Sequence, residues 1–225
     1  MTGFGPFIDA QAHRPDDPVP TGWSRLSALV DDPAVFSARA EAVRAALEER
    51  RVAAGSPGRT VAWQVAVSTA HLGLVARFVA ATCAARAQRL PMAFDARDVW
   101  WRDVHGGPVP LSLPQGTSSP IAPNEPRIDP WVEAFTQVTV DVHGLSAKVA
   151  WGNVAAAANS AAVLMSQARP DLYDTVHALA DRILADPRVE GGTLRAGPDF
   201  RRRSCCLIYK VSGNRQAVCG DCVLR

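Results

Sequence analysis

The stretch TVAWQVAVSTAHLGLVARFVAATCAARAQ, residues 60–88, decides the fold. It is apolar on nearly every side of a helix and rich in alanine, and Gly73 is its one glycine. A helix that is apolar all round is typically buried inside a protein, so we expect a central helix that ends before Pro91. Cys83 lies within this stretch, and we expect it to be a core residue rather than a ligand.

Helix-start signals occur on both sides of this stretch. Asp32-Pro33 and Asp129-Pro130 each place a capping carboxylate before a proline suited to the first turn. The first signal predicts a helix that ends near Gly55. Further helices are expected over four ranges: 21–30, 130–143, 146–167 and 171–186. For the second of these ranges, the alternation of Val138, Val140 and Val142 fits a strand equally well.

A small β contribution is expected over residues 99–113. Trp100 and Trp101 precede Gly106-Gly107, and apolar residues follow, which is the pattern of a hairpin. Pro108 and Pro110 would confine its second strand to a sheet edge. The predicted fold class is therefore mainly α with a minor β part (α+β).

The chain divides into three predicted parts. Residues 1–20 form an irregular lead-in, residues 21–198 a predominantly helical domain, and residues 199–225 a C-terminal segment that carries most of the cysteines. With 225 residues, 48% of them hydrophobic, the chain is long and apolar enough to bury a core. Its formal net charge of +2 gives no reason to expect a nucleic-acid partner.

Membrane and export signals are not visible in the sequence. Residues 61–87 contain His71, Arg77 and Arg86, and residues 145–165 contain Lys148, so neither stretch offers about 18 uncharged apolar residues. The N-terminal residues lack a basic start followed by an apolar run. We therefore expect no transmembrane segment and a cytoplasmic protein.

Four of the five cysteines lie within the last 21 residues, in the order C-C, twelve residues, C-x-x-C. An odd number of cysteines in a reducing compartment argues against a disulfide framework. Leu207–Val211 has β propensity, and Gly213-Asn214 is a favourable two-residue turn, so a hairpin is expected here. In that hairpin Cys205 would face Cys222, and four thiols would gather at its open end.

Four cysteines without a nearby histidine suit either a structural zinc ion or an iron–sulfur cluster. Neighbouring residues on a strand point to opposite faces, so the adjacent pair Cys205-Cys206 fits one tetrahedral zinc ion poorly. A [2Fe–2S] cluster is larger, and this geometry modestly favours iron. A thiol–disulfide pair formed by Cys219 and Cys222 is a further alternative.

The cysteine segment resembles the C-terminal [2Fe–2S] motif of the siderophore-iron reductase (ferric iron reductase FhuF-like) family, which has an unusual C-C…C-x-x-C arrangement. A second match, Ser146-Ala-Lys148-Val-Ala-Trp151-Gly152-Asn153, is similar to the family's S-x-K-x-x-W-G-N helix. The interval of twelve residues is longer than is usual in the family. We expect this difference to affect the solvent exposure and the reduction potential of a cluster, and not which residues bind it. Residues 1–130 contribute no motif to the resemblance.

This resemblance implies a ferric-siderophore reductase in the cytoplasm that transfers one electron to chelated Fe(III) and releases Fe(II). It implies a [2Fe–2S] cluster as cofactor and four metal ligands: Cys205, Cys206, Cys219 and Cys222. The partners would be a ferric siderophore and an external electron donor. Peripheral contact with an importer at the inner membrane face is also an expectation. The alternatives are a zinc-stapled helical binding domain and an iron–sulfur electron carrier of another pathway.

Candidates for docking a substrate or partner come from the arginine run before the cysteines and from the expected helix over residues 146–167. Five residues are in this set: Arg201, Arg202, Arg203, Lys148 and Asn153. Positive charge beside four thiolates would raise the reduction potential of a cluster and attract an anionic partner. The alternative interpretation of the three arginines is a solvated run of charges. The alternative for Asn153 is a structural role, in which it bonds a buried backbone group. No phosphate loop, nicotinamide motif or Ser/His/Asp grouping is legible, so any electrons must come from outside the chain.

Overall fold

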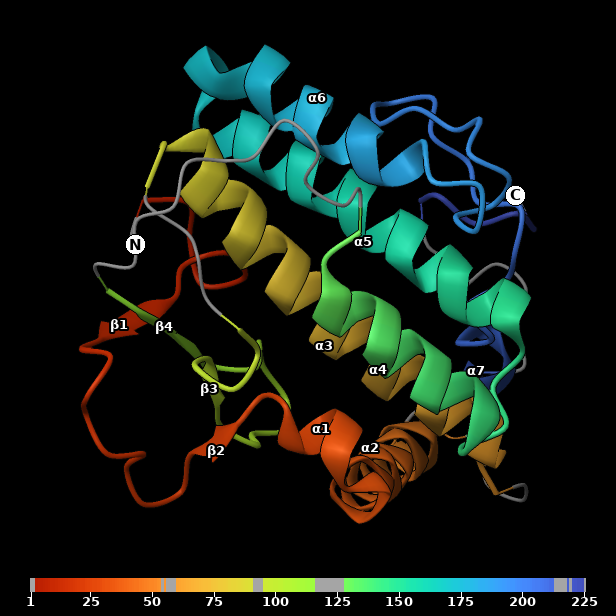
Figure 1. Ribbon diagram of the computed structural model, residues 1–225. Helices are drawn as coiled ribbons and strands as arrows, with labels where there is room; N and C mark the ends of the chain where they lie inside the picture. Colours follow the sequence, from red (N-terminus) through yellow and green to blue (C-terminus); the bar gives the residue numbers. More distant parts are fainter. Residues whose placement is uncertain are drawn as a thin grey trace.

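The computed structural model describes residues 3–53, 55, 60–90, 95–115, 128–212, 218 and 220–224. It is mainly helical with a small mixed sheet, which confirms the predicted fold class (Figure 1). The long helices are α2 (Pro33–Ala53), α3 (Trp63–Ala87), α4 (Pro130–Asp141), α5 (Ala147–Ala168) and α6 (Tyr173–Leu184). Three short helical segments accompany them: α1 (Ala28–Asp31), η1 (Pro170–Leu172) and α7 (Tyr209–Ser212).

Helix α3 is the centre of the core, as its all-round apolar surface predicts. It packs most extensively against α5 and also contacts α2, α4 and α6. By length and composition it could cross a membrane, but 78% of its most apolar window is buried inside the protein. A single helix of this kind that is mostly buried is weak evidence for a membrane span. Cys83 is buried in this core, as expected, and burial raises its pKa to about 11.

The predicted helix starts are found at α2 and α4. The Asp129 carboxylate accepts a hydrogen bond from the Trp131 amide at 2.9 Å, and the Asp32 carboxylate accepts one from the Ala34 amide at 2.9 Å. Residues 130–141 are helical because this cap and proline are followed by a face that packs on the core. The strand alternative for Val138, Val140 and Val142 is therefore wrong.

The sheet has the order β1-β4-β3-β2 and lies at one side of the helices (Figure 1). Its strands are β1 (Gln11–His13), β2 (Ser24–Arg25), β3 (Trp100–Trp101) and β4 (Leu111–Pro114). Strands β3 and β4 form the expected antiparallel pair. However, β4 also pairs in parallel with β1, so it is an inner strand and not the predicted edge. Pro108 and Pro110 precede the paired residues and do not interrupt them.

Two expectations for the N-terminal part need correction. The lead-in over residues 1–20 contains β1, since Gln11–His13 aligns with the end of β4 across about 100 residues of chain. The helix expected over residues 21–30 begins only at Ala28, because Ser24 and Arg25 pair with β3 instead.

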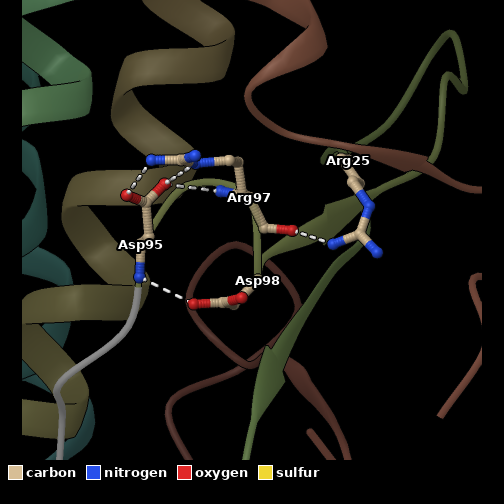
Figure 2. A network of polar contacts seen from close by, with 4 residues as sticks. All are labelled: Arg25, Asp95, Arg97 and Asp98. Carbon is tan, nitrogen blue, oxygen red and sulfur yellow. Dashed lines mark hydrogen bonds and ion pairs between the residues drawn. The ribbon is translucent and has the colours of Figure 1, made fainter. Parts of the chain in front are cut away.

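The loop that leads into β3 is fixed by a polar network, which Figure 2 shows. The Asp95 carboxylate accepts hydrogen bonds from the Arg97 backbone at 2.9 Å and from its guanidinium. Asp95 in turn donates its amide to Asp98, and Arg25 donates to the Arg97 carbonyl oxygen at 2.5 Å. The network ties β2 to the entry of β3.

Candidate metal centre

The C-terminal segment lies at the end of the helices away from the sheet (Figure 1). Cys206 and Cys222 are buried and Cys205 is half-buried, whereas Cys219 lies outside the described residues. Among the described residues, no three His, Cys, Asp or Glu side chains form a ready metal-binding group.

The predicted cysteine-bearing hairpin is wrong over residues 207–211. Leu207 has a positive φ of 69°, and the chain then forms helix α7 instead of a strand. The expected turn at Gly213-Asn214 lies outside the described residues. Leu207, Ile208 and Val211 pack against a small apolar cluster of Leu47, Val61 and Val65, which lies on α2 and at the start of α3. This packing stabilises the helical turn.

Backbone amides point at two of the thiols. The Leu207 amide donates to Cys205 Sγ at 3.3 Å, and the Leu224 amide donates to Cys222 Sγ at 3.4 Å. Burial raises the pKa of the Cys205 thiol, the Leu207 amide lowers it, and negative charge on Cys206 and Cys222 raises it again. These three sulfurs therefore share one electrostatic environment. Cysteines bind a metal centre as thiolates, so these thiols must lose their protons when one is bound.

A buried polar network connects this segment to α3 and α5. Arg202 donates from Nη2 to Asn153 Oδ1 at 2.9 Å, and Asn153 Nδ2 donates to the Ser68 carbonyl oxygen at 3.0 Å. Ser68 Oγ donates to the Cys206 carbonyl oxygen at 2.9 Å. Ser68 on α3 thus holds the backbone of Cys206, and Asn153 on α5 holds the side chain of Arg202.

Gly152 allows the segment to approach α5 closely. A Cβ atom at this position would lie 1.7 Å from Ser204 Oγ and 2.7 Å from Glu190 Oε1. Ser204 Oγ donates to Glu190 Oε1, and the Arg203 amide donates to Glu190 Oε2 at 2.5 Å. The Trp-Gly-Asn sequence on α5 therefore meets the residues that directly precede the cysteine pair.

A surface pocket of about 260 Å³ opens beside this contact. Its walls are formed by Lys148, Trp151, Arg188, Glu190 and Arg203. The Arg188 guanidinium lies 4.9 Å from the centre of the Trp151 ring, in the range of a cation–π contact. Hydrogen bonds to Asp186 and Glu133 raise the pKa of Arg188, so it stays charged. Three cations and one carboxylate line the pocket, but Asp186 and Glu133 offset the charge of Arg188, so the positive character of the lining comes from Lys148 and Arg203. We call it the cationic pocket.

The five predicted docking residues are placed in three different ways. Lys148 and Arg203 line the cationic pocket. Arg201 is exposed and donates to the Gly220 carbonyl oxygen at 2.5 Å. Arg202 and Asn153 are 2% and 0% exposed and bind each other, so they cannot dock a partner and that expectation is corrected.

Sequence reasoning missed several residues of this arrangement. Ser68, Ser204, Glu190 and Arg188 carry no motif that marks them, and they join the site through contacts between distant parts of the chain. Gly152 could have been found, because it lies within the Trp-Gly-Asn match. His71 is fully buried and contacts Asn153 and Thr136, as a core histidine does.

A comparison with protein families identifies the segment. Residues 202–224 match the FhuF 2Fe-2S C-terminal domain. The cofactor of this segment is a [2Fe–2S] cluster, as predicted, which favours iron over the zinc alternative. No curated protein and no solved structure matches the chain.

The described residues fit such a cluster in three respects. The donors are thiols, the ligands that iron–sulfur clusters take. Backbone amides donate to Cys205 and Cys222, as is usual around cluster sulfurs. In addition, Arg202 Nε is a buried donor with no acceptor among the described residues. Among the described residues, the Nε–H group of the buried Arg202 therefore has no acceptor, and Arg202 lies three positions before Cys205.

Proposed function

We propose that the protein is a ferric-siderophore reductase. A [2Fe–2S] cluster, when bound by Cys205, Cys206, Cys219 and Cys222, supplies one-electron transfer. The observation that carries the proposal is the cationic pocket next to the segment that matches a FhuF 2Fe-2S domain. Arg203, which lines the pocket, is two positions before Cys205 in the chain.

The pocket supports a substrate with negative charge. Siderophores hold Fe(III) with hard, anionic oxygen atoms, and a ferric tricatecholate keeps net negative charge, whereas a ferric trihydroxamate is neutral. Lys148 and Arg203 can donate hydrogen bonds to such oxygens, while Arg188, which Asp186 and Glu133 already bind, lies over the Trp151 ring. At about 260 Å³ the pocket suits one arm of a chelate, with the rest in solvent.

The larger cavity elsewhere in the protein is a poorer docking place for an anion. It has a volume of about 750 Å³, and its walls come from α1, the loop before β3 and the start of α4. Asp31, Asp95 and Asp129 line it together with a single cation, Arg97, which Asp95 already binds. An anionic chelate would be repelled there.

Reduction of the metal accounts for release without any acid–base residue. An external donor protein loses one electron and the chelated Fe(III) gains it. The resulting Fe(II) is less charged and softer, so the same oxygen ligands hold it far more weakly. The roles left to this chain are to hold the chelate near the cysteines and to keep the cysteine loop in place.

The test is an oxygen-free assay with cluster-loaded protein. A ferredoxin, its reductase and NADPH supply electrons, a ferric trihydroxamate or tricatecholate is the acceptor, and a coloured Fe(II) chelator traps the product. We expect one Fe(II) for each electron supplied, at a rate that depends on the protein. If the donor reduces the cluster but neither ferric chelate reoxidises it, the electron-carrier alternative replaces this proposal.

A charge reversal tests the docking place. Lys148→Glu should lower kcat/KM for the anionic ferric tricatecholate by about tenfold, mainly through KM, because an attractive charge becomes repulsive. The matched control is Arg195→Glu, which reverses an exposed charge outside the pocket and should leave kcat/KM within about twofold. Equal effects of the two substitutions would assign the loss to overall charge and remove the pocket from the proposal.

A further inference from the structure

Arg202 is a buried cation in the cysteine segment. It is 2% exposed and lies three positions before Cys205. Its backbone amide donates to the Asp221 carbonyl oxygen at 3.0 Å, which ties the two cysteine-bearing parts of the segment together. Its Nη2 atom donates to Asn153 Oδ1 at 2.9 Å and reaches Ser204 Oγ at 3.5 Å.

The groups that Arg202 contacts are neutral. In the part of the chain that the structure describes, no carboxylate lies within ion-pair distance of its guanidinium. Glu190 is separated from it by Ser204 and is already bonded to Ser204 and to the Arg203 amide. His71, the other titratable group in this network, is uncharged, since burial keeps its pKa at about 3.

A buried charge without an opposite charge is strongly destabilising, so proteins pair such charges or let them face a metal centre. The opposite charge that this segment acquires is that of its cofactor. Two irons with two sulfides and four thiolates carry net negative charge in both oxidation states, and more of it after reduction.

We propose that the buried Arg202 guanidinium is the fixed counter-charge of the [2Fe–2S] cluster, and that it favours the reduced state. Because Arg202 is out of solvent, its field is little screened by salt or water. Arg201 and Arg203 are exposed, so their charges are screened and have less effect on the cluster. Arg202 is thus a positioning residue that acts on the cysteine centre and not on the substrate.

The identity of residue 153 agrees with this role. An aspartate there would match the size of asparagine and would accept the same hydrogen bond from Arg202. It would also neutralise the guanidinium. Asn153 instead accepts the bond through a neutral amide oxygen and anchors itself to Ser68, so the positive charge remains available to the cluster.

The inference depends on the cofactor and not on the siderophore substrate, so it can fail or hold independently of the reductase proposal. The experiment is a redox titration of the cluster-loaded protein followed by its electron paramagnetic resonance signal, with iron counted per chain. Four proteins are compared: the wild type, Arg202→Gln, Arg202→Lys and the neighbouring exposed control Arg203→Gln.

We expect Arg202→Gln to lower the equilibrium constant for reduction by about tenfold, which is about 59 mV for one electron. Arg202→Lys keeps the charge and should stay within about threefold of the wild type, as should Arg203→Gln. An unchanged potential in Arg202→Gln, or an equal shift in Arg203→Gln or Arg202→Lys, would overturn the inference.

Arg202→Gln could fail to hold iron, and its potential could then not be measured. In that case the iron content of Arg202→Lys is the test. If Arg202→Lys then keeps its iron, the charge is what the centre needs, and the inference stands. If both variants lose iron equally, the shape of the guanidinium matters and not its charge, and the inference is wrong.

Discussion

Gly152 is the residue whose size matters most for the way the cysteine segment sits on α5. Glycine inside a helix normally costs about 0.5–1 kcal/mol relative to alanine, because it loses more backbone freedom on folding. Here the absence of a Cβ atom makes room for Ser204 Oγ, which would otherwise be 1.7 Å away. The contact between α5 and the cysteine segment therefore requires glycine at position 152, although glycine lowers the stability of the helix itself.

Gly152→Ala is expected to destabilise the protein by about 1–3 kcal/mol, because the added methyl group must displace Ser204. The cluster content should fall as well, since Ser204 directly precedes Cys205. Gly73→Ala is the matched control, because Gly73 also lies inside a long helix and has open space around its Cβ position. That variant should be more stable by about 0.5–1 kcal/mol. Chemical unfolding and iron per chain measure both effects, and stabilisation by both substitutions would contradict the role of Gly152.

Among the elements, α7 depends most on its surroundings. Four helical residues cannot form a stable helix by themselves, because helix nucleation is costly. What holds α7 is the packing of Leu207, Ile208 and Val211 on the apolar cluster between α2 and α3. The position of the cysteine pair is therefore coupled to residues far away in the sequence.

Val65→Ala should loosen α7 without unfolding the domain. Val65 is 2% exposed, and removing two methyl groups from this small cluster should cost about 1–2 kcal/mol of local stability. We expect faster hydrogen exchange at the Lys210 and Val211 amides, which donate to Leu207 and Ile208 carbonyl oxygens. Exchange in α6 should be unchanged.

Val52→Ala on α2 is the control for this substitution, because Val52 is 62% exposed and has little packing to lose. If exchange in residues 207–212 responds to neither substitution, or equally to both, the apolar cluster is not what holds α7.

Comparison of α4 and α7 explains which elements the sequence predicts. At α4, the Asp129 cap, the proline and the apolar spacing all favour a helix, and the structure has one. At α7, a short apolar run has strand propensity, and tertiary packing overrides it. Strand β1 is missed for a related reason: three residues pair with a strand about 100 positions away, and no local signal marks that contact.

The candidate site, too, is predicted from the sequence only in part. The spacing of the cysteines predicts a thiolate centre, because the four donors are close in sequence. The contacts that support it, from Ser68 to Cys206 and from Asn153 to Arg202, join residues 138 and 49 positions apart. Such contacts are set by how the helices pack, so neither composition nor periodicity could reveal them. The cationic pocket likewise exists only after α5 and residues 188–203 are brought together.

At the scale of the whole molecule, the centre is supported at the starts of α3 and α5, which lie at the same end of the protein (Figure 1). The sheet and the larger cavity, which Asp31, Asp95 and Asp129 line, are formed by other elements. The positive charges that serve the proposed reaction are thus kept apart from the carboxylates that line the larger cavity. His71 of α3 lies in the core that α3 forms with α4 and α5, where it contacts Thr136 and Asn153.

His71 makes that core sensitive to pH. It is fully buried, and burial, with a further contribution from the charge of Arg202, lowers its pKa to about 3 from an ordinary value of 6.5. Its neighbours on α4 and α5, Thr136 and Asn153, are neutral, and Arg202 is the charged group nearby. Between pH 6.5 and pH 3 the unfolded chain binds a proton at this residue and the folded chain does not. The stability is therefore complete above pH 6.5 and is lost as the pH falls toward 3.

The expected size is a loss of about 2 kcal/mol in the free energy of unfolding between pH 7 and pH 5, since one pKa unit corresponds to about 1.4 kcal/mol. Chemical unfolding of the cluster-loaded protein at both pH values, followed by tryptophan fluorescence, measures it. His71→Gln removes the titrating group and should remove this part of the pH dependence, although it lowers stability at pH 7. His105→Gln, at an exposed position, should keep the wild-type slope, and any acid lability of the cysteine centre is common to all three proteins. If His71→Gln retains the full slope, the pH dependence has another origin and the buried imidazole is not kept neutral by its surroundings.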